Sequence, residues 1–263
     1  MADEAPPSER VLAFAKLTLS LRIVGMREDG YHLLDAEMVT VDLADVLVFS
    51  PGDSLEVVDG VTGTAPSGAG ATAPAAAAGV PTGDDNLVRR ALRAVGRRAR
   101  VRLEKRIPAG AGLGGGSADA AAVLRWAGVV GASADELAMA ARLGSDVPFS
   151  LVGGRARVTG AGEALEVLPF EDRVFTILTP PFGVSTAAAY RAWDGLGSRA
   201  RGGTGGNDLE AAALSIEPRL RRWRERLREA TGREPALAGS GSTWFVEGAF
   251  PGGDRIVVHT ARP

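Results

Sequence analysis

The chain has 263 residues, which allows one large domain or two smaller ones that each bury a core. Its formal net charge of −2 provides no basic field for holding nucleic acid. The chain contains no cysteine, which excludes disulfides, thiolate zinc sites and a thiol nucleophile.

The N-terminal residues also argue against secretion or membrane insertion. Residues 1–10 are acidic and polar, whereas a signal peptide is basic and then apolar. No uncharged apolar run approaches the roughly 20 residues of a membrane-spanning helix. We therefore expect a cytoplasmic protein that associates with no membrane.

The first half of the chain predicts a β-hairpin followed by a mixture of helices and strands. Alternating apolar and polar residues predict strands at 14–24, 36–50, 54–60 and 100–108. Apolar residues at helical spacing predict helices at 85–98, after the capping candidate Asp85, and at about 116–128 and 133–143. Residues 60–84 are almost all Gly, Ala, Pro, Thr and Ser, which predicts a mobile loop.

The second half combines strands and helices in no regular alternation. Strands are predicted at 155–160, 164–169, 173–180, 236–248 and 254–261, and helices at 185–193, 207–216 and 218–232. No internal repeat is found. These features favour an α+β protein with two lobes, which we place at residues 1–150 and 151–263.

Lysine is unusually rare. Of the 30 basic residues only Lys16 and Lys105 are lysine, and all the others are arginine. A lysine is a compact point charge, whereas arginine is a broad planar fork, so a position that kept lysine is one where the fork is predicted not to fit. The arginine clusters near 97–106 and 219–228 alternate with apolar residues, which is typical of solvated helix and strand faces.

A glycine-rich segment precedes one of the predicted helices. Five of the seven residues at 110–116 are glycine, and Ser117 follows them. Unpaired N–H groups and the helix dipole favour anions at such a helix start. Residues 110–115 match G-x-G-x-x-G, but the strand and acidic residue of a dinucleotide fold do not follow, and a Walker A loop would need a lysine before Ser117. Two alternatives remain for this segment: a loop that binds phosphate, and a turn that only lets a strand pack closely on a helix.

The segment 108–121, PAGAGLGGGSADAA, resembles the phosphate-binding motif of the GHMP small-molecule kinases. Further matching motifs occur at 15–19, 29–34, 85–86, 143–151, 160–163, 207–210 and 238–243. Their order is similar to that of one branch of this family, whose members phosphorylate the 2-hydroxyl of 4-diphosphocytidyl-2-C-methyl-D-erythritol in the non-mevalonate isoprenoid pathway. The resemblance covers nearly the whole chain.

This resemblance implies a fold and a set of ligands. The N-terminal lobe would be similar to part of ribosomal protein S5 and the C-terminal lobe would be ferredoxin-like, with ATP and the acceptor meeting between them. The cofactors would be ATP and Mg²⁺, with no metal ligands assigned. The partner would be a small molecule that bears a cytidine diphosphate group, and the protein would be a monomer or a homodimer.

The resemblance also implies the residues that bind ATP. They lie in the glycine-rich segment, near the adenine and in a second glycine turn of the other lobe. The set is Asn86, Lys105, Pro108, Gly110, Gly112, Leu113, Gly114, Gly115, Gly116, Ser117, Gly239, Ser240 and Gly241.

Two residues match the family's catalytic positions. Phosphoryl transfer needs charge neutralisation, in-line positioning and a group that takes or orients the hydroxyl proton. Asp146 matches the acid, and Lys16 matches its partner. A nearby lysine keeps the carboxylate ionised and offsets charge on the transferred group.

The scarce aromatic residues match the acceptor pocket. Tyr31 and Tyr190 are the only tyrosines, and they fit the two positions that stack on cytosine, while His32 fits the position at the edge of the base. Thr18 and Thr186 complete the set of substrate-binding positions. Base stacking contributes roughly 1 to 3 kcal/mol.

The chain departs from the pattern of this branch in three places. Thr18 stands where Asn is usual, and Ala118 stands where the second Ser of the motif is usual. We expect the first change to affect acceptor contact and the second to weaken the phosphate loop slightly. Residues 191–206 are short and rich in Gly and Arg, which predicts an open pocket wall.

Two other functions remain open. Another GHMP kinase, acting on homoserine, mevalonate or a sugar, would keep the glycine segment but would not need a pair of tyrosines for cytosine. A non-catalytic nucleotide-binding relative would not need both Lys16 and Asp146.

Overall fold

The computed structural model of the chain describes residues 8–60, 76–197 and 206–263. Its first sheet has six strands and its second has four. The first contains β1 (Glu9–Met26), β2 (His32–Ser50), β3 (Ser54–Asp59), β4 (Arg100–Lys105), β5 (Arg155–Gly160) and β6 (Ala164–Val167). The second contains β7 (Val174–Leu178), β8 (Ala236–Leu237), β9 (Trp244–Glu247) and β10 (Ile256–His259).

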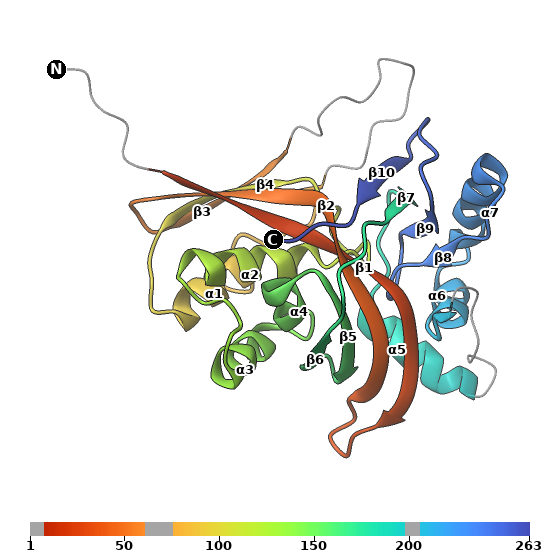
Figure 1. Ribbon diagram of the computed structural model, residues 1–263, viewed down its shortest axis with the longest axis horizontal. Helices are drawn as coiled ribbons and strands as arrows, with labels where there is room; N and C mark the ends of the chain where they lie inside the picture. Colours follow the sequence, from red (N-terminus) through yellow and green to blue (C-terminus); the bar gives the residue numbers. More distant parts are fainter. Residues whose placement is uncertain (1–7, 61–75, 198–205) are drawn as a thin grey trace.

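The long hairpin of β1 and β2 is the backbone of the first sheet. The two strands pair in antiparallel register from Glu9 opposite Phe49 to Met26 opposite His32. The other edge of β2 pairs with β4 over one part and with β5 over another. Figure 1 shows this hairpin curving through the molecule, and Lys16 and Thr18 of β1 line the cavity described below.

Four helices lie beside the first sheet, and α2 contacts β1 and β2 directly. They are α1 (Leu87–Ala94), α2 (Gly115–Trp126), α3 (Ala134–Leu143) and α4 (Val147–Val152). Every residue from 118 to 124 of α2 is buried. Alanine is abundant there because small side chains allow the neighbouring strands and helices to approach closely.

The second sheet carries its own helices and joins the first through a shared core. The helices are α5 (Thr186–Leu196), α6 (Glu210–Ile216) and α7 (Leu220–Thr231), and Figure 1 shows them on the side of β8 and β9. Trp244 is fully buried among them. Leu17 and Val39 of the first sheet pack with Ile177 and Val258 of the second, so one apolar cluster links the two sheets.

Most predicted elements are confirmed, with two differences. The cap of α1 is Asn86, whose side chain accepts a hydrogen bond from the N–H of Val88, and the expectation of Asp85 was wrong. Helix α4 was not predicted because its six residues are too short to show helical periodicity. The segment 236–248 forms β8 and β9 on either side of the second glycine turn, as predicted.

Some expectations fall partly outside the described residues. Of the predicted mobile loop at 60–84, residues 61–75 lie outside them, whereas 76–84 contain turns. Of the predicted open wall at 191–206, residues 198–205 lie outside them. The α+β class is confirmed by the two sheets with their helices. The first sheet continues to Val167, beyond residue 150, and the division of lobes at that residue stays a prediction.

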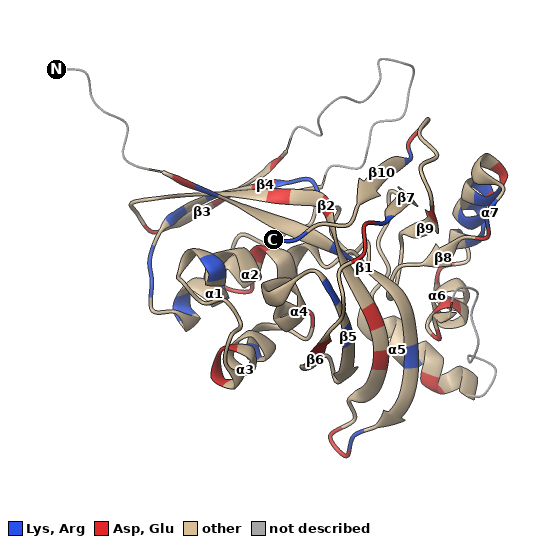
Figure 2. Ribbon diagram, in the orientation of Figure 1, with Lys and Arg blue, Asp and Glu red and all other residues tan. Residues whose placement is uncertain are grey.

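The arginine clusters lie on solvated faces, as predicted. Figure 2 shows the positions of basic and acidic residues mixed along α7 and the outer strands. On α7, Arg226 pairs with Asp254 and Arg228 pairs with Glu225. In the described part of the chain, no helix has both the length and the apolar composition needed to cross a bilayer.

The buried core gives a stability prediction. Leu47 of β2 has no exposed surface, and its replacement by Ala leaves a cavity between the sheet and the helices. We expect Leu47→Ala to lower the free energy of unfolding by about 2 to 5 kcal/mol. The control is Val24→Ala on β1, where the side chain is 64% exposed and the expected change is within about 0.5 kcal/mol. Urea denaturation of both variants measures the difference, and equal losses would contradict this description of the core.

Candidate active site between the two sheets

A cavity of about 970 Å³ lies between the glycine-rich segment, β1 and α5. It brings together every predicted site residue except Gly241. The predicted residues that line it are Lys16, Thr18, Tyr31, His32, Asn86, Lys105, Pro108, Gly110, Gly112, Leu113, Gly114, Gly115, Gly116, Ser117, Asp146, Thr186, Tyr190, Gly239 and Ser240. Residues more than 200 positions apart therefore form one site.

Two glycines of the loop are required by the packing of the protein itself. Gly112 has a φ of +79°, and a Cβ there would lie 2.2 Å from the carbonyl oxygen of Ala238. Gly114 has a φ of +71°, and a Cβ there would lie 2.9 Å from Cγ of Lys16. Both positions favour glycine for conformation as well as for space. The glycine loop therefore packs closely against the second glycine turn.

Gly116 has no such packing requirement. A Cβ at this position would meet only Cδ1 of Leu87, at 3.5 Å, which is ordinary van der Waals contact. Gly116 lies in the first turn of α2 and lines the cavity. The packing of the described residues therefore does not require glycine at this position.

The start of α2 presents backbone donors to the cavity. Gly114 is the N-cap and supplies no side-chain cap. The first helical hydrogen bond runs from the N–H of Ala118 to the carbonyl of Gly114, at 2.9 Å. The N–H groups at 115–117 precede this bond, and such groups favour an anionic ligand together with the helix dipole.

Lys16 and Asp146 form an ion pair in the wall of the same cavity. The backbone N–H of Lys16 donates to the carbonyl of Leu113, at 3.0 Å, which fixes β1 to the glycine loop. Its Nζ lies 3.5 Å from Oδ2 of Asp146. The lysine side chain is 7% exposed and the aspartate side chain is 31% exposed, so the carboxylate reaches the cavity while the ammonium group lies beneath it.

Thr18 and Ala118, the two single residues that depart from the branch pattern, have different surroundings. Thr18 Oγ1 accepts a hydrogen bond of 2.9 Å from Nζ of Lys16, so its hydroxyl orients the ammonium group. Ala118 is 1% exposed in the core beneath α2 and does not line the cavity. The absence of a hydroxyl at Ala118 therefore does not alter the described wall of the site.

The residues assigned to adenine are engaged with other parts of the protein. Asn86 Oδ1 accepts from the N–H of Val88, at 2.8 Å, and its Nδ2 donates to the carbonyl of Pro81, at 2.6 Å. Lys105 is 2% exposed, and its Nζ bonds to Asp45 and Asp119. Both residues line the cavity, and their contact with adenine stays a prediction.

An aromatic cluster lies where the start of β2 meets α5, and its residues His32 and Tyr190 line the cavity. The rings of His32 and Tyr190 are stacked, with centroids 4.8 Å apart and planes inclined by 25°. Trp193 meets His32 edge-on at 5.5 Å. Burial, with a further contribution from the charge of Asp146, raises the pKa of Tyr190, so its phenol is neutral at physiological pH.

The stacking of His32 on Tyr190 changes the expected role of His32. A spacing of 4.8 Å leaves no room for a base between His32 and Tyr190. Nε2 of His32 is 2.7 Å from Oδ1 of Asp194, which leaves Nδ1 for other partners. Tyr31 is 61% exposed at the rim, with the guanidinium of Arg27 5.3 Å from its ring centre. The cytosine sandwich of the two tyrosines stays a prediction.

The second glycine turn is tied to α5. Thr186 Oγ1 and Ser240 Oγ are 2.9 Å apart in a hydrogen bond. A Cβ at Gly239 would lie 3.3 Å from Nζ of Lys16, so this turn closes over the lysine. The predicted residues of the two lobes are thereby joined by direct contacts.

Three acidic residues that hold predicted site residues were missed from sequence. Asp194 holds His32, and Asp45 and Asp119 hold Lys105. Asp119 lay inside the recognised motif, but its spacing gave no sign that it faces Lys105. Asp45 and Asp194 occur in ordinary strand and helix patterns, and only the folded chain brings them to the site.

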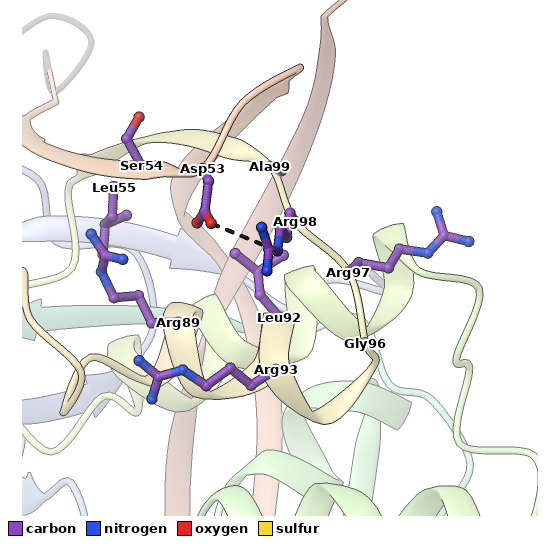
Figure 3. Close-up of a pocket in the computed structure, with 10 residues that line it drawn as sticks. All are labelled: Asp53, Ser54, Leu55, Arg89, Leu92, Arg93, Gly96, Arg97, Arg98 and Ala99. Atoms are coloured by element: carbon purple, nitrogen blue, oxygen red, sulfur yellow. Dashed lines mark ion pairs between the residues drawn. The ribbon is translucent and has the colours of Figure 1, made fainter.

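A second pocket, of about 430 Å³, lies between α1 and β3 and does not have the same character. It contains Arg89, Arg93, Arg97 and Arg98, but their guanidinium groups point in different directions (Figure 3). Arg98 faces Asp53, with 3.8 Å between their charged atoms. These side chains converge on no common point. The larger cavity is therefore the candidate functional site.

No group of three or more His, Cys, Asp or Glu side chains that could hold a metal occurs within residues 8–60, 76–197 and 206–263. A magnesium ion that accompanies a nucleotide needs few protein ligands because phosphate oxygens and water supply most of them. The hydroxyl of Ser117 and the carboxylate of Asp146 both line the cavity. Oxygen donors of this kind fit Mg²⁺.

Comparison with known proteins agrees with this geometry. Residues 86–154 match the model of the GHMP kinases N terminal domain. A protein of Pelotomaculum thermopropionicum named 4-diphosphocytidyl-2-C-methyl-D-erythritol kinase is 38% identical, over 89% of this chain and 87% of its own length. A protein of Paracoccus denitrificans with the same name is 37% identical, over 91% of this chain and 87% of its own length.

The solved structures include one with the same type of name. A crystal structure of 4-(cytidine 5'-diphospho)-2C-methyl-D-erythritol kinase superposes with a TM-score of 0.72 at 32% identity, and the match covers 96% of this chain and 100% of that chain. The match to that kinase covers 96% of this chain, which has the two-lobed fold, the glycine loop and the Lys16–Asp146 pair. The chain belongs to the GHMP kinases, in the family of the 4-diphosphocytidyl-2-C-methyl-D-erythritol kinases.

Proposed function

We propose that this kinase transfers the γ-phosphoryl group of ATP to the 2-hydroxyl of 4-diphosphocytidyl-2-C-methyl-D-erythritol, a step of the non-mevalonate isoprenoid pathway. The observation that carries the proposal is the Lys16–Asp146 pair, 3.5 Å apart, between an anion-favouring helix start and an aromatic cluster. The names of the similar proteins support the choice of acceptor. We further propose that it acts in the cytoplasm.

Asp146 and Lys16 have complementary tasks in this transfer. The carboxylate of Asp146 faces the cavity and accepts or orients the proton of the attacking hydroxyl. Nζ of Lys16, oriented by Thr18, offsets negative charge on the transferred phosphoryl group. The N–H groups at 115–117 hold the triphosphate in line with that hydroxyl.

A bound Mg²⁺ would neutralise charge on the β- and γ-phosphate oxygens. Ser117 and Asp146 are the residues proposed to contact it, because their oxygens line the cavity beside the helix start.

The acceptor is proposed to bind between the rim and α5. Tyr190 and Tyr31 would stack on the cytosine, and Nδ1 of His32 would meet its edge, since Nε2 faces Asp194. Thr186, which is bonded to Ser240, would align the part of the acceptor nearer the reacting group. Specificity for cytidine would thus depend on the aromatic end of the cavity.

Removing either charged partner tests the chemistry. Asp146→Asn and Lys16→Ala should each reduce kcat by at least about a hundredfold, because proton handling or charge neutralisation is lost. Lys16→Arg should also fail, because a broad guanidinium does not fit beneath Gly114 and Gly239. Steady-state phosphorylation and ATP calorimetry measure turnover and binding separately. Near-normal turnover by Asp146→Asn would refute its assignment.

Gly116→Ala tests the approach of phosphate to the helix start. The added methyl group has space within the protein, so we expect the fold to be retained while the KM for ATP rises at least tenfold, because a close N–H contact is obstructed. Gly112→Ala is the contrasting variant, since its Cβ would collide with Ala238 and should lower the melting temperature. An unchanged KM for ATP in a well-folded Gly116→Ala protein would leave the loop as a packing turn.

The aromatic cluster gives a specificity prediction. Tyr190→Ala should raise the KM for the cytidine acceptor by the equivalent of about 1 to 3 kcal/mol and spare that for ATP. His32→Ala should reduce the preference for cytosine over uracil. Phe170→Ala, an aromatic substitution outside the cavity, is the control. Equal effects of Tyr190→Ala on both substrates would contradict the placement of the base.

A further inference from the structure

A buried charge cluster lies beneath the glycine loop, formed by Asp45 of β2, Lys105 of β4 and Asp119 of α2. Nζ of Lys105 bonds to Oδ2 of Asp45 and, at 2.8 Å, to Oδ2 of Asp119. The three residues are 0%, 2% and 3% exposed, respectively. Charges this deeply buried are costly unless they are paired, so their placement imposes a strong geometric requirement.

The cluster contacts both ends of the glycine loop. Oδ1 of Asp45 accepts from the backbone N–H groups of Arg106 and Ile107, where the chain leaves β4 and enters the loop. Asp119 lies in α2 just after the loop ends. Lys105 joins the two carboxylates, and its Nζ lies 3.2 Å from the place of a Cβ on Gly115. The start and the end of the loop are therefore held by one ammonium group.

Asp119 is not fully satisfied within the cluster. Burial, only partly offset by Lys105, raises the pKa of Asp119 to about 7. Its Oδ1 has no hydrogen-bond partner in the described structure, and the residue lines the cavity. Most buried polar atoms in proteins have such a partner, so this oxygen is an exception at the wall of the site.

We propose that Asp45, Lys105 and Asp119 form a positioning triad that holds the helix start and the loop entry at the spacing that receives the triphosphate of ATP. Asp119 acts through Lys105 and the loop backbone and is a positioning residue. The triad belongs to nucleotide binding and leaves the acceptor end of the cavity unaffected. This inference rests on the proposed role of the loop in binding ATP.

Asp119→Ala tests the triad, because it removes the contact at the helix end and keeps the Asp45–Lys105 pair. We expect the KM for ATP to rise at least about tenfold, with the KM for the acceptor within twofold of its original value and kcat reduced less than the affinity. Asp119→Asn keeps an oxygen acceptor for Lys105 and should restore most of the ATP affinity. Asp45→Ala would leave two buried N–H donors unpaired and serves only to measure stability.

Leu124→Ala is the matched structural control. It lies on the same helix, is fully buried and does not line the cavity, so it should lower the melting temperature with an unchanged KM for ATP. The triad is refuted if Asp119→Ala leaves the KM for ATP unchanged, raises both KM values equally, or behaves as Leu124→Ala does. Gly116→Ala separates the triad proposal from the proposal that the loop binds phosphate. If Gly116→Ala raises the KM for ATP while Asp119→Ala does not, the triad proposal fails and the phosphate-loop proposal stands. If neither variant affects ATP, both proposals fail.

Discussion

The contact between two glycine turns is the constraint on which this site depends. The backbone of Gly112 lies against Ala238 and Gly241, and Lys16 lies between Gly114 and Gly239. Because no side chain separates these segments, the lysine is held close to both lobes and to Asp146. The same close packing orients the start of α2 toward the cavity. The proposed binding of phosphate by the loop and the proposed handling of the acceptor proton by Asp146 thus depend on a single packing arrangement.

Much of the fold and site could be predicted from the sequence. The strands of the first hairpin and the helices after the glycine segment follow from their periodicity, and the motifs identified Lys16, Asp146 and Ser117 without coordinates. Motif order along the chain predicted one site, and the structure places the three residues along one cavity. The chemical role of each residue is a separate question, addressed by the variants proposed above.

Other features could not be predicted, for physical reasons. Helix α4 is too short for a periodic signal. Asp45 and Lys105 are 60 positions apart, and their pairing depends on the register of β2 against β4. The stack of His32 on Tyr190 arises where the end of a hairpin meets a helix from the other lobe. Sequence patterns report which face of an element is buried, but they do not report what packs against it.

The cavity is proposed to phosphorylate a cytidine-bearing alcohol. Turnover by the purified protein with magnesium ATP and 4-diphosphocytidyl-2-C-methyl-D-erythritol, beside mevalonate, homoserine and galactose, tests this proposal. We expect transfer to the cytidine compound and at most trace transfer to the other three. Turnover of mevalonate, homoserine or galactose with none of the cytidine compound would contradict this function.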